Sequence, residues 1–441
     1  MKEPFSSGAS RKGAVGDLIP VALIGGFMLI TALRFLSDDY PNTAISACFF
    51  LSYRYGFIGR AFIGTVLEVF PYISKTMLLR ICYLSEILMS LAVLFWTYTV
   101  MKRTSGRERT FAFLAILLFL ATPFSPLFTY LWYNCGRMDV FLISIIFIQS
   151  ALFIKRPKGA SVFIILLTAL GMLIHTGHTF MYFSVSAALL LTMAVSGQNF
   201  GKPDRISSGA EGPEGTESLP SGRSSVISIK AFIPSMINLL VCIVLFSCFH
   251  FTSFVNKDYT AETMVSDMQS RTDADLSIIT ENVDSWYFMD AETYVAFQSD
   301  FDPYGSPSVA GTLVITLILL LPVIFVIAYI WIRAFRTEED PLRKAVYVLC
   351  GICWMTVLPE YLLETDMGRY TASAFMTQSL ILMSLYFSGD RGVTQGVNDL
   401  LSMFKKRPLL WIFLAAETVS LGYMQDVLTL PISERIWSYI H

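Results

Sequence analysis

The sequence predicts an all-α protein whose helices cross a membrane about eleven times and form one bundle. Hydrophobic residues make up 54% of the chain and charged residues only 15%, whereas soluble proteins carry roughly 25% charged residues. The mean hydropathy is +0.58. Apolar runs longer than a soluble core helix recur along the chain. Because lipid offers the backbone no hydrogen-bond partners, each of these runs is predicted to be a helix.

The apolar runs place the spans in order along the chain. The predicted spans are residues 18–36, 76–101, 110–130, 139–154, 161–175, 179–197, 231–255, 311–332, 345–363, 371–387 and 409–430. Residues 160–196 are assigned two spans, because basic residues flank the segment on both sides and so place both flanks on the same side of the membrane. The predicted return between these two spans is the turn His175-Thr-Gly-His178.

The distribution of basic residues orients the bundle. Of the 32 lysines and arginines, 22 lie in residues 1–17 and in the five segments between spans that share its side of the membrane. Basic residues favour the cytoplasmic side. The N-terminus is therefore predicted inside and the C-terminus outside, in the plasma membrane (the bacterial inner membrane). Residues 1–17 are polar and no small-residue cleavage site follows the first span, so a cleavable signal is not expected.

The remaining segments complete the predicted organisation. The glycine- and aromatic-rich stretch from Phe49 to Phe70 predicts one or two helices at the outer interface. No internal repeat is found, which disfavours an inverted-repeat transporter. The predicted parts are a cytoplasmic N-terminus (1–17), spans one to six (18–197) with an outer interfacial segment (37–75), a flexible cytoplasmic linker (198–230), span seven (231–255), a folded outer cap with eleven acidic residues (256–310), spans eight to eleven (311–430) and an outer C-terminus (431–441).

Polar residues with chemical potential gather on the predicted outer face, which indicates one outward-facing site. They are Asp38, Asp39, Arg54, Arg60, Arg137, Asp139, His175, His178, Glu360, Glu364, Asp366 and Arg369. Asp38 and Asp39 follow the first span directly. A carboxylate between lipid and water has a raised pKa and suits proton abstraction from a hydroxyl. The alternative is a polar stop at the membrane edge.

The arginines suggest an anion site. Arg54 and Arg60 either bind phosphate oxygens with the guanidinium fork or extend toward lipid headgroups. Arg137 lies in a loop before a helix that Asp139 is predicted to cap, and a helix N-terminus favours anions. Arg369, Glu360 and Asp366 complete the binding candidates. Asp366 is alternatively a simple ion-pair partner of Arg369.

His175 and His178 are catalytic candidates through hydrogen bonding or proton transfer, and packing in the turn is the alternative. Two histidines do not make a zinc site without a third ligand. No metal site is predicted, although the acidic outer loop is compatible with a divalent cation. Glu86 and Glu417 lie within spans and are expected to face the bundle interior.

The cysteines and the net charge add little to the functional prediction. Cys48 and Cys135 are both predicted outside, and whether they pair is left open. Cys350 and Cys353 lie inside a span, which disfavours a redox role for their CxxC spacing. The net charge of −2 gives no indication of nucleic-acid binding.

The layout resembles the GT-C superfamily of membrane glycosyltransferases. An acidic pair ends the first span, an interfacial stretch follows, and a large outer loop precedes the eighth span. Short motifs are also similar to bacterial surface-polysaccharide polymerase-like membrane proteins, at residues 53–59, 136–139, 175–180 and 366–369. In such chains glutamate often follows the histidine, but Thr176 stands here, so a His–Glu pair is not carried over. The resemblance implies that Asp38 or Asp39 acts on the acceptor and that the donor is a polyprenyl-phosphate-linked sugar.

The expected function is transfer of a sugar from a polyprenyl-phosphate or pyrophosphate carrier to a glycan or lipid acceptor, in cell-surface polysaccharide synthesis. One alternative is an O-antigen- or capsule-type polymerase or ligase, in which arginines rather than a carboxylate dominate. A transporter or flippase of lipid-linked sugars would show ionisable groups at the midplane and repeated halves. A scaffold without catalysis would not need so many costly polar groups near lipid.

Overall fold

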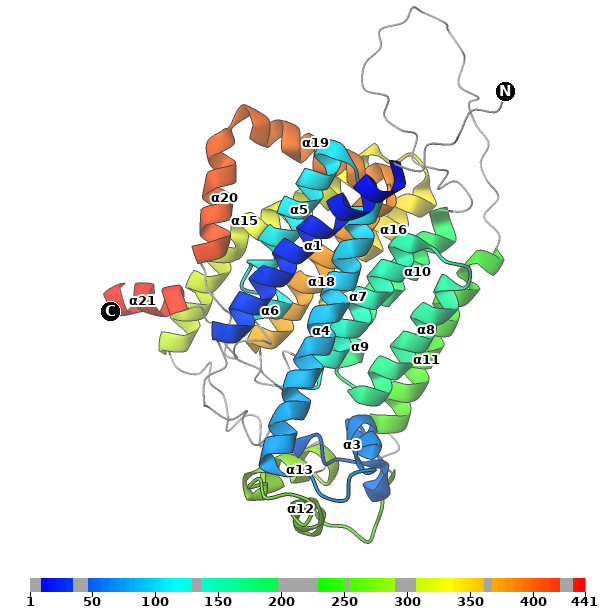
Figure 1. Ribbon diagram of the computed structural model, residues 1–441, viewed down its shortest axis with the longest axis vertical. Helices are drawn as coiled ribbons and strands as arrows, with labels where there is room; N and C mark the ends of the chain where they lie inside the picture. The colour runs from blue at the N-terminus through cyan, green and yellow to red at the C-terminus, as the bar shows by residue number, and fades with distance from the viewer. Residues whose placement is uncertain are drawn as a thin grey trace, which may run out of the picture.

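The computed structural model is almost entirely helical (Figure 1). It describes residues 9–34, 47–128, 136–196, 229–250, 254–289, 307–360, 367–420 and 431–440. Within these ranges the β structure is one antiparallel ladder, in which β1 (Gly56–Phe57) pairs with β2 (Phe254–Val255). The predicted all-α fold class is confirmed at this level.

Within the described residues each predicted span overlaps a helix, but the predicted span 110–130 is interrupted after Leu120 and the predicted span 231–255 ends in strand β2. The helices are α1 (Ala9–Arg34), α4 (Lys75–Arg103), α5 (Gly106–Leu120), α6 (Pro126–Phe128), α7 (Asp139–Lys155), α8 (Ala160–Ile174), α9 (His178–Met181), α10 (Phe183–Ser196), α11 (Ile233–His250), α15 (Pro307–Thr337), α16 (Pro341–Ile352), α18 (Met367–Ser388) and α20 (Pro408–Ser420). The 3₁₀ turns η4 (Ile229–Phe232) and η7 (Cys353–Val357) adjoin α11 and α16.

Three helices in the described ranges are long and apolar enough to cross a membrane, which indicates a membrane protein. They cover Lys75–Arg103, Ile229–Phe249 and Val314–Thr337. Leu18–Ala32, Ala160–Ile174 and Phe183–Val195 are apolar but shorter. The crossing number of about eleven therefore stays a prediction.

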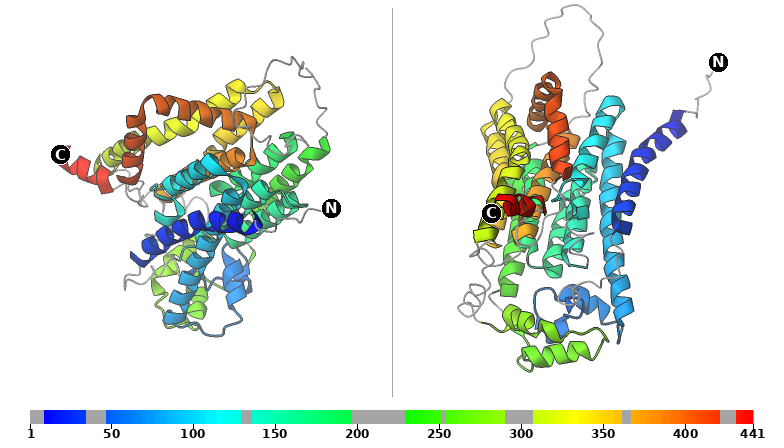
Figure 2. Two further views of the ribbon diagram at one scale, coloured as in Figure 1. Left: turned by 45° about the horizontal axis from the view of Figure 1, so that its top comes forward. Right: turned by 90° about the vertical axis from the view of Figure 1, so that its left-hand side faces the viewer.

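The bundle core lies around α4 and α7. The buried indole of Trp96 on α4 meets the Phe147 ring of α7 edge-on, at 5.3 Å between ring centroids. Glu86 on α4 is only 9% exposed, so it faces the interior as predicted. Figure 2 shows α1 on one side of this core and α15 with α16 on the opposite side.

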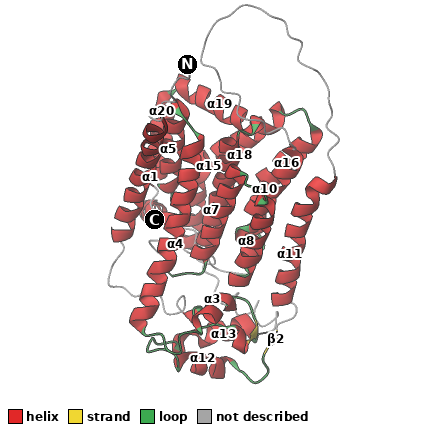
Figure 3. Cartoon of the chain, turned by 45° about the vertical axis from the view of Figure 1, so that its right-hand side comes forward, coloured by secondary structure: helices red, strands yellow, loops and turns green. Residues whose placement is uncertain are grey.

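One end of the bundle, here called the cap end, carries the short elements of two distant segments (Figures 1 and 3). The first segment contributes η1 (Tyr53–Tyr55), β1 and α3 (Ala61–Leu67). The second contributes β2, α12 (Ala261–Gln269), η5 (Ser277–Ile279) and α13 (Thr280–Tyr287). Residues 254–289, called the cap, are therefore folded, and α3 is a helix within the predicted interfacial stretch.

The opposite end, here called the α19 end, carries α19 (Arg391–Lys406), which the sequence analysis left as part of a cytoplasmic segment (Figure 1). Asp390 caps this helix by accepting from the Val393 N–H at 3.0 Å. Its buried carboxylate also accepts from the Tyr347 hydroxyl at 2.7 Å and from Arg343 at 3.0 Å. These bonds tie the start of α19 to α16, and Arg333 on α15 pairs with Asp399 on α19. The final helix, α21 (Pro431–Ile440), lies against α15.

Candidate functional site

Most of the predicted site residues lie at the cap end. Asp38, Asp39, Glu364 and Asp366 fall outside the described residues, as do Cys135 and the side chain of Glu417. The described candidates are Arg54, Arg60, Arg137, Asp139, Glu360, Arg369, His175 and His178.

Arg60 sits at a strained point of the loop that links β1 to α3. Its backbone is left-handed, with φ of 65°, a conformation that costs a non-glycine residue about 1–2 kcal/mol. Two cap residues hold this loop. The guanidinium carbon of Arg60 lies 4.1 Å from the Trp286 ring centre, and the Tyr287 hydroxyl donates to the Gly59 carbonyl at 2.8 Å. The side chain is therefore clamped before any ligand arrives.

The predicted turn between two helices is present, since α8 ends at Ile174 and α9 starts at His178. The Gly177 N–H donates to Nδ1 of His175 at 2.8 Å. Nδ1 is therefore an acceptor, and the neutral ring carries its proton on Nε2. A Cβ on Gly59 would lie 3.1 Å from the Thr176 methyl group, so the Arg60 loop and this turn are in contact.

Three arginines act electrostatically on His175. Burial lowers the pKa of His175 well below its usual value, and the charges of Arg60, Arg369 and Arg137 lower it further. A buried imidazole close to cations avoids becoming a cation itself. His175 is therefore neutral at pH 7 and offers Nε2–H as a donor.

Arg369 is anchored differently from the sequence-based prediction. It lies in the first turn of α18 and pairs with Asp139 at 3.2 Å, with side-chain exposures of 10% and 1%. Asp139 is itself the first residue of α7, and Met138 occupies the N-cap position. The predicted capping role of Asp139 is wrong, because the carboxylate turns to the α18 arginine. The Asp366 alternative lies outside the described residues.

These residues form what we call the arginine–histidine site, composed of Arg60, Arg137, Arg369 and His175. Cys48 borders it. Burial raises the pKa of the Cys48 thiol, while the same three arginines oppose this rise. Cys48 is a free thiol. Three guanidinium groups from separate segments thus act electrostatically on one buried imidazole, and guanidinium groups are suited to binding phosphate oxygens.

Other candidates lie outside this set. Arg54 is 42% exposed, pairs with Asp267 at 3.3 Å and approaches Glu68 at 3.9 Å, so it ties η1 to the cap. Glu360 is buried at 8% exposure, three residues after η7 ends. His178 is fully buried, and burial lowers its pKa to about 3. Its ring fills the space above Gly171, where a Cβ would lie 3.0 Å away. His178 therefore has a packing role in the turn.

The sequence analysis missed the role of Trp286. No local pattern in the sequence connects an aromatic residue of the cap with an arginine 226 positions earlier. Among the described residues, no three His, Cys, Asp or Glu side chains gather in a way that could hold a metal ion.

Comparison of the chain with protein-family models, with curated proteins and with solved structures returned no match.

Proposed function

We propose that this protein is a GT-C-like membrane glycosyltransferase that acts on a polyprenyl-phosphate-linked sugar. The observation that carries the proposal is that the Arg369–Asp139 pair and the contact between Gly59 and Thr176 bring the segments of Arg60, Arg137 and Arg369 to the surroundings of His175, whose pKa all three arginines lower. Guanidinium groups bind phosphate oxygens in pairs. A lipid phosphate would reach a membrane protein at the ends of its spans, and His175 directly follows α8 while Arg369 lies in the first turn of α18.

The cap end is the outer face in this proposal, and about eleven spans separate it from the cytoplasmic α19 end. Arg391, Lys405 and Lys406 on α19 and Arg343 on α16 support this orientation, because basic residues favour the cytoplasmic side. The described start of α1 also lies toward the α19 end (Figure 1).

Each group has a defined part in the proposed reaction. Asp38 or Asp39 accepts the proton of the acceptor hydroxyl as its oxygen bonds to the anomeric carbon. The bond from that carbon to the phosphate oxygen breaks, and the phosphate leaves with the electron pair. The arginines stabilise the growing negative charge, and Nε2–H of His175 donates to a phosphate oxygen. Preformed cations stabilise the leaving group without reorganisation of solvent.

Binding of a polyprenyl phosphate to the purified protein tests the site. Arg60→Gln and Arg137→Gln should each weaken binding by about tenfold or more, because a hydrogen bond to a charged group contributes about 1.5–3 kcal/mol. Arg369→Lys keeps the charge beside Asp139 and should lose affinity through the missing fork. Arg54→Gln is the matched control and should bind within about twofold of the parent protein.

Two results would sink the proposal. One is equal binding by all four variants. The other is intact polysaccharide assembly in cells that carry Asp38→Asn together with Asp39→Asn. A third outcome is that the arginine variants lose binding while the reaction survives Asp38→Asn together with Asp39→Asn. That outcome would favour the polymerase or ligase alternative, in which arginines rather than a carboxylate dominate.

A further inference from the structure

Arg271 is a buried cation in the cap that the proposed reaction does not use. It follows the end of α12, and the residue is only 6% exposed. Within the described part of the chain, its terminal nitrogens Nη1 and Nη2 are both buried and have no hydrogen-bond partner. A buried charge without a partner is costly. An anion bound to this guanidinium group would remove that cost.

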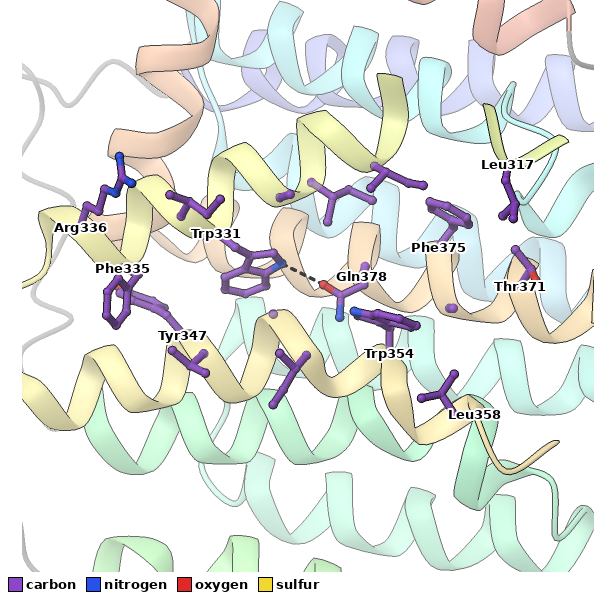
Figure 4. A pocket seen from close by; sticks show the side chains of 18 residues that line it. Leu317, Trp331, Phe335, Arg336, Tyr347, Trp354, Leu358, Thr371, Phe375 and Gln378 are labelled. Carbon is purple, nitrogen blue, oxygen red and sulfur yellow. Dashed lines mark hydrogen bonds between the residues drawn. The ribbon is translucent and has the colours of Figure 1, made fainter. Parts of the chain in front are cut away.

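Other buried polar groups of this protein show how the cost is usually avoided. In the apolar groove between α15, α16 and α18, Nε1 of Trp331 donates to the side-chain oxygen of Gln378 at 2.8 Å (Figure 4). The buried guanidinium group of Arg369 pairs with the Asp139 carboxylate at 3.2 Å. Arg271 differs from both, since the described residues provide no such acceptor for it.

The carboxylates nearest to Arg271 in the sequence are engaged with other groups. Asp267 accepts from the Tyr55 hydroxyl at 2.7 Å and pairs with Arg54 at 3.3 Å. Asp273 accepts from the backbone N–H of Lys75 at 2.5 Å. Neither carboxylate therefore neutralises the buried cation.

An aromatic ring orients the guanidinium group without satisfying it. The guanidinium carbon lies 5.9 Å from the centre of the Phe50 ring, and Phe50 is itself fully buried. A ring face attracts a cation weakly, but it accepts no conventional hydrogen bond. The N–H groups of Nη1 and Nη2 are thus held in place and remain available to an acceptor.

The backbone around Arg271 is fixed by its own hydrogen bonds. The Arg271 carbonyl accepts from the Ile73 N–H at 2.9 Å, which ties this point of the cap to the segment before α4. The Gln269 side chain braces the loop that follows, because its Nε2 donates to the Ala274 carbonyl at 2.7 Å and its Oε1 accepts from the Leu276 N–H at 2.7 Å. A binding group held in this way loses little freedom when a ligand arrives.

We infer that Arg271 is the anchor of an anion site inside the cap, and that this site binds one compact oxyanion group, a carboxylate or a phosphate. The guanidinium fork presents two N–H groups side by side, which matches two oxygens of such a group. Since both terminal nitrogens are shielded from bulk water, the ligand lies within the cap and should exchange slowly. The site uses none of the arginines of the arginine–histidine site, so the inference does not depend on the proposed function.

Equilibrium dialysis of the purified full-length chain against inorganic phosphate and against glucuronate tests the inference. Arg271→Met should weaken binding of the preferred anion by about tenfold or more, because hydrogen bonds to charged groups are strong. Arg271→Lys keeps the charge without the fork and should bind with intermediate affinity. Arg80→Met, which removes an exposed arginine of α4, is the matched control and should bind within about twofold of the parent protein.

The two probes and one further variant separate the sources of the anion. Tighter binding of glucuronate indicates an acidic sugar, and tighter binding of phosphate indicates a free or esterified phosphate. Arg60→Gln should leave binding at Arg271 intact. Loss of phosphate binding in Arg60→Gln but not in Arg271→Met overturns the inference and leaves the proposed function standing, whereas the reverse result supports the Arg271 site alone. No binding of either anion by the parent protein also overturns the inference.

Thermal unfolding at matched ionic strength gives a second readout. The anion that binds should raise the melting temperature of the parent protein, because it stabilises the folded state, and this rise should be absent in Arg271→Met. In anion-free buffer Arg271→Met should melt at the same temperature as the parent protein or higher, since it no longer buries an unpaired charge. A large fall would mean that the chain itself supplies a partner for Arg271, and it would overturn the inference, as would an unchanged rise with the anion.

Discussion

Removing the indole of Trp286 should open the clamp on Arg60. Trp286→Ala deletes the ring that lies 4.1 Å from the guanidinium carbon, and it leaves the Tyr287 bond to Gly59 and the β1–β2 ladder in place. The cap is expected to stay folded through these contacts and through the bond from the Tyr55 hydroxyl to Asp267 at 2.7 Å. The change therefore acts on the position of one side chain.

The expected loss of binding free energy in Trp286→Ala has two contributions. A cation–π contact contributes about 0.5–1 kcal/mol when exposed and about 2 kcal/mol when desolvated, and both partners here are partly buried. The left-handed backbone of Arg60 also stores about 1–2 kcal/mol of strain, which the clamp helps to offset. A loss of about 1–2 kcal/mol corresponds to a 5- to 30-fold weaker interaction with a polyprenyl phosphate.

The assay is equilibrium binding of a polyprenyl phosphate to purified variants at fixed salt. Trp286→Phe keeps an aromatic face and should recover most of the affinity. Tyr72→Ala, which removes a 51% exposed ring at the cap end, should have no effect. Wild-type affinity in Trp286→Ala, with an unchanged melting temperature, would refute the view that the cap positions Arg60.

Three further predictions concern stability. The pKa of His178 is about 3 in the folded protein and about 6.5 in the unfolded chain. Neutral His178 therefore contributes fully to the free energy of unfolding above pH 6.5, and this contribution falls by ~2 kcal/mol at pH 5. His178→Phe should make the melting temperature less dependent on pH between pH 7.5 and 5. Gly64→Ala should lower stability by about 3 kcal/mol or more, since the new Cβ would lie 1.8 Å from a backbone oxygen, whereas Gly26→Ala, with nothing within 4 Å, should be tolerated in the same thermal melts. Asp390→Asn removes one partner of a buried pair and should cost about 3–5 kcal/mol, and Asp399→Asn, in a more exposed pair, should cost less than about 1 kcal/mol in denaturant titrations.

The helices were predictable from sequence because apolar runs determine them locally. Residues 75–103 and 139–155 match the predicted spans within a few positions. Helix α19 was missed because its apolar residues occupy only one face, and that face is buried by close approach of Gly392 and Gly396 to α15 and α16. A hydropathy pattern alone does not show such a tertiary contact.

The candidate site was predictable as a set of residue types but not as an arrangement. Arginine near a glycine-rich loop suggested an anion site for both Arg54 and Arg60. The two arginines have different surroundings because Arg54 pairs with Asp267 and Arg60 lies over Trp286, and both partners are cap residues more than 200 positions away. Likewise, the Asp139 position suggested a cap, because the sequence does not show that Arg369 packs beside it. Long-range pairing of charges is the information that local patterns lack.

The cations at the cap end imply a measurable response to ligand. Arg60, Arg137 and Arg369 all lower the pKa of His175, so their positive charges act on one region of the cap end that a bound anion would meet. A polyprenyl phosphate that binds only the folded state should stabilise it by ~2.7 kcal/mol at 100 times its Kd, seen as a rise in melting temperature. Uncharged polyprenol, which lacks the phosphate, should give little rise because lipid already solvates the chain. Equal stabilisation by both compounds would mean that the arginines do not recognise the phosphate.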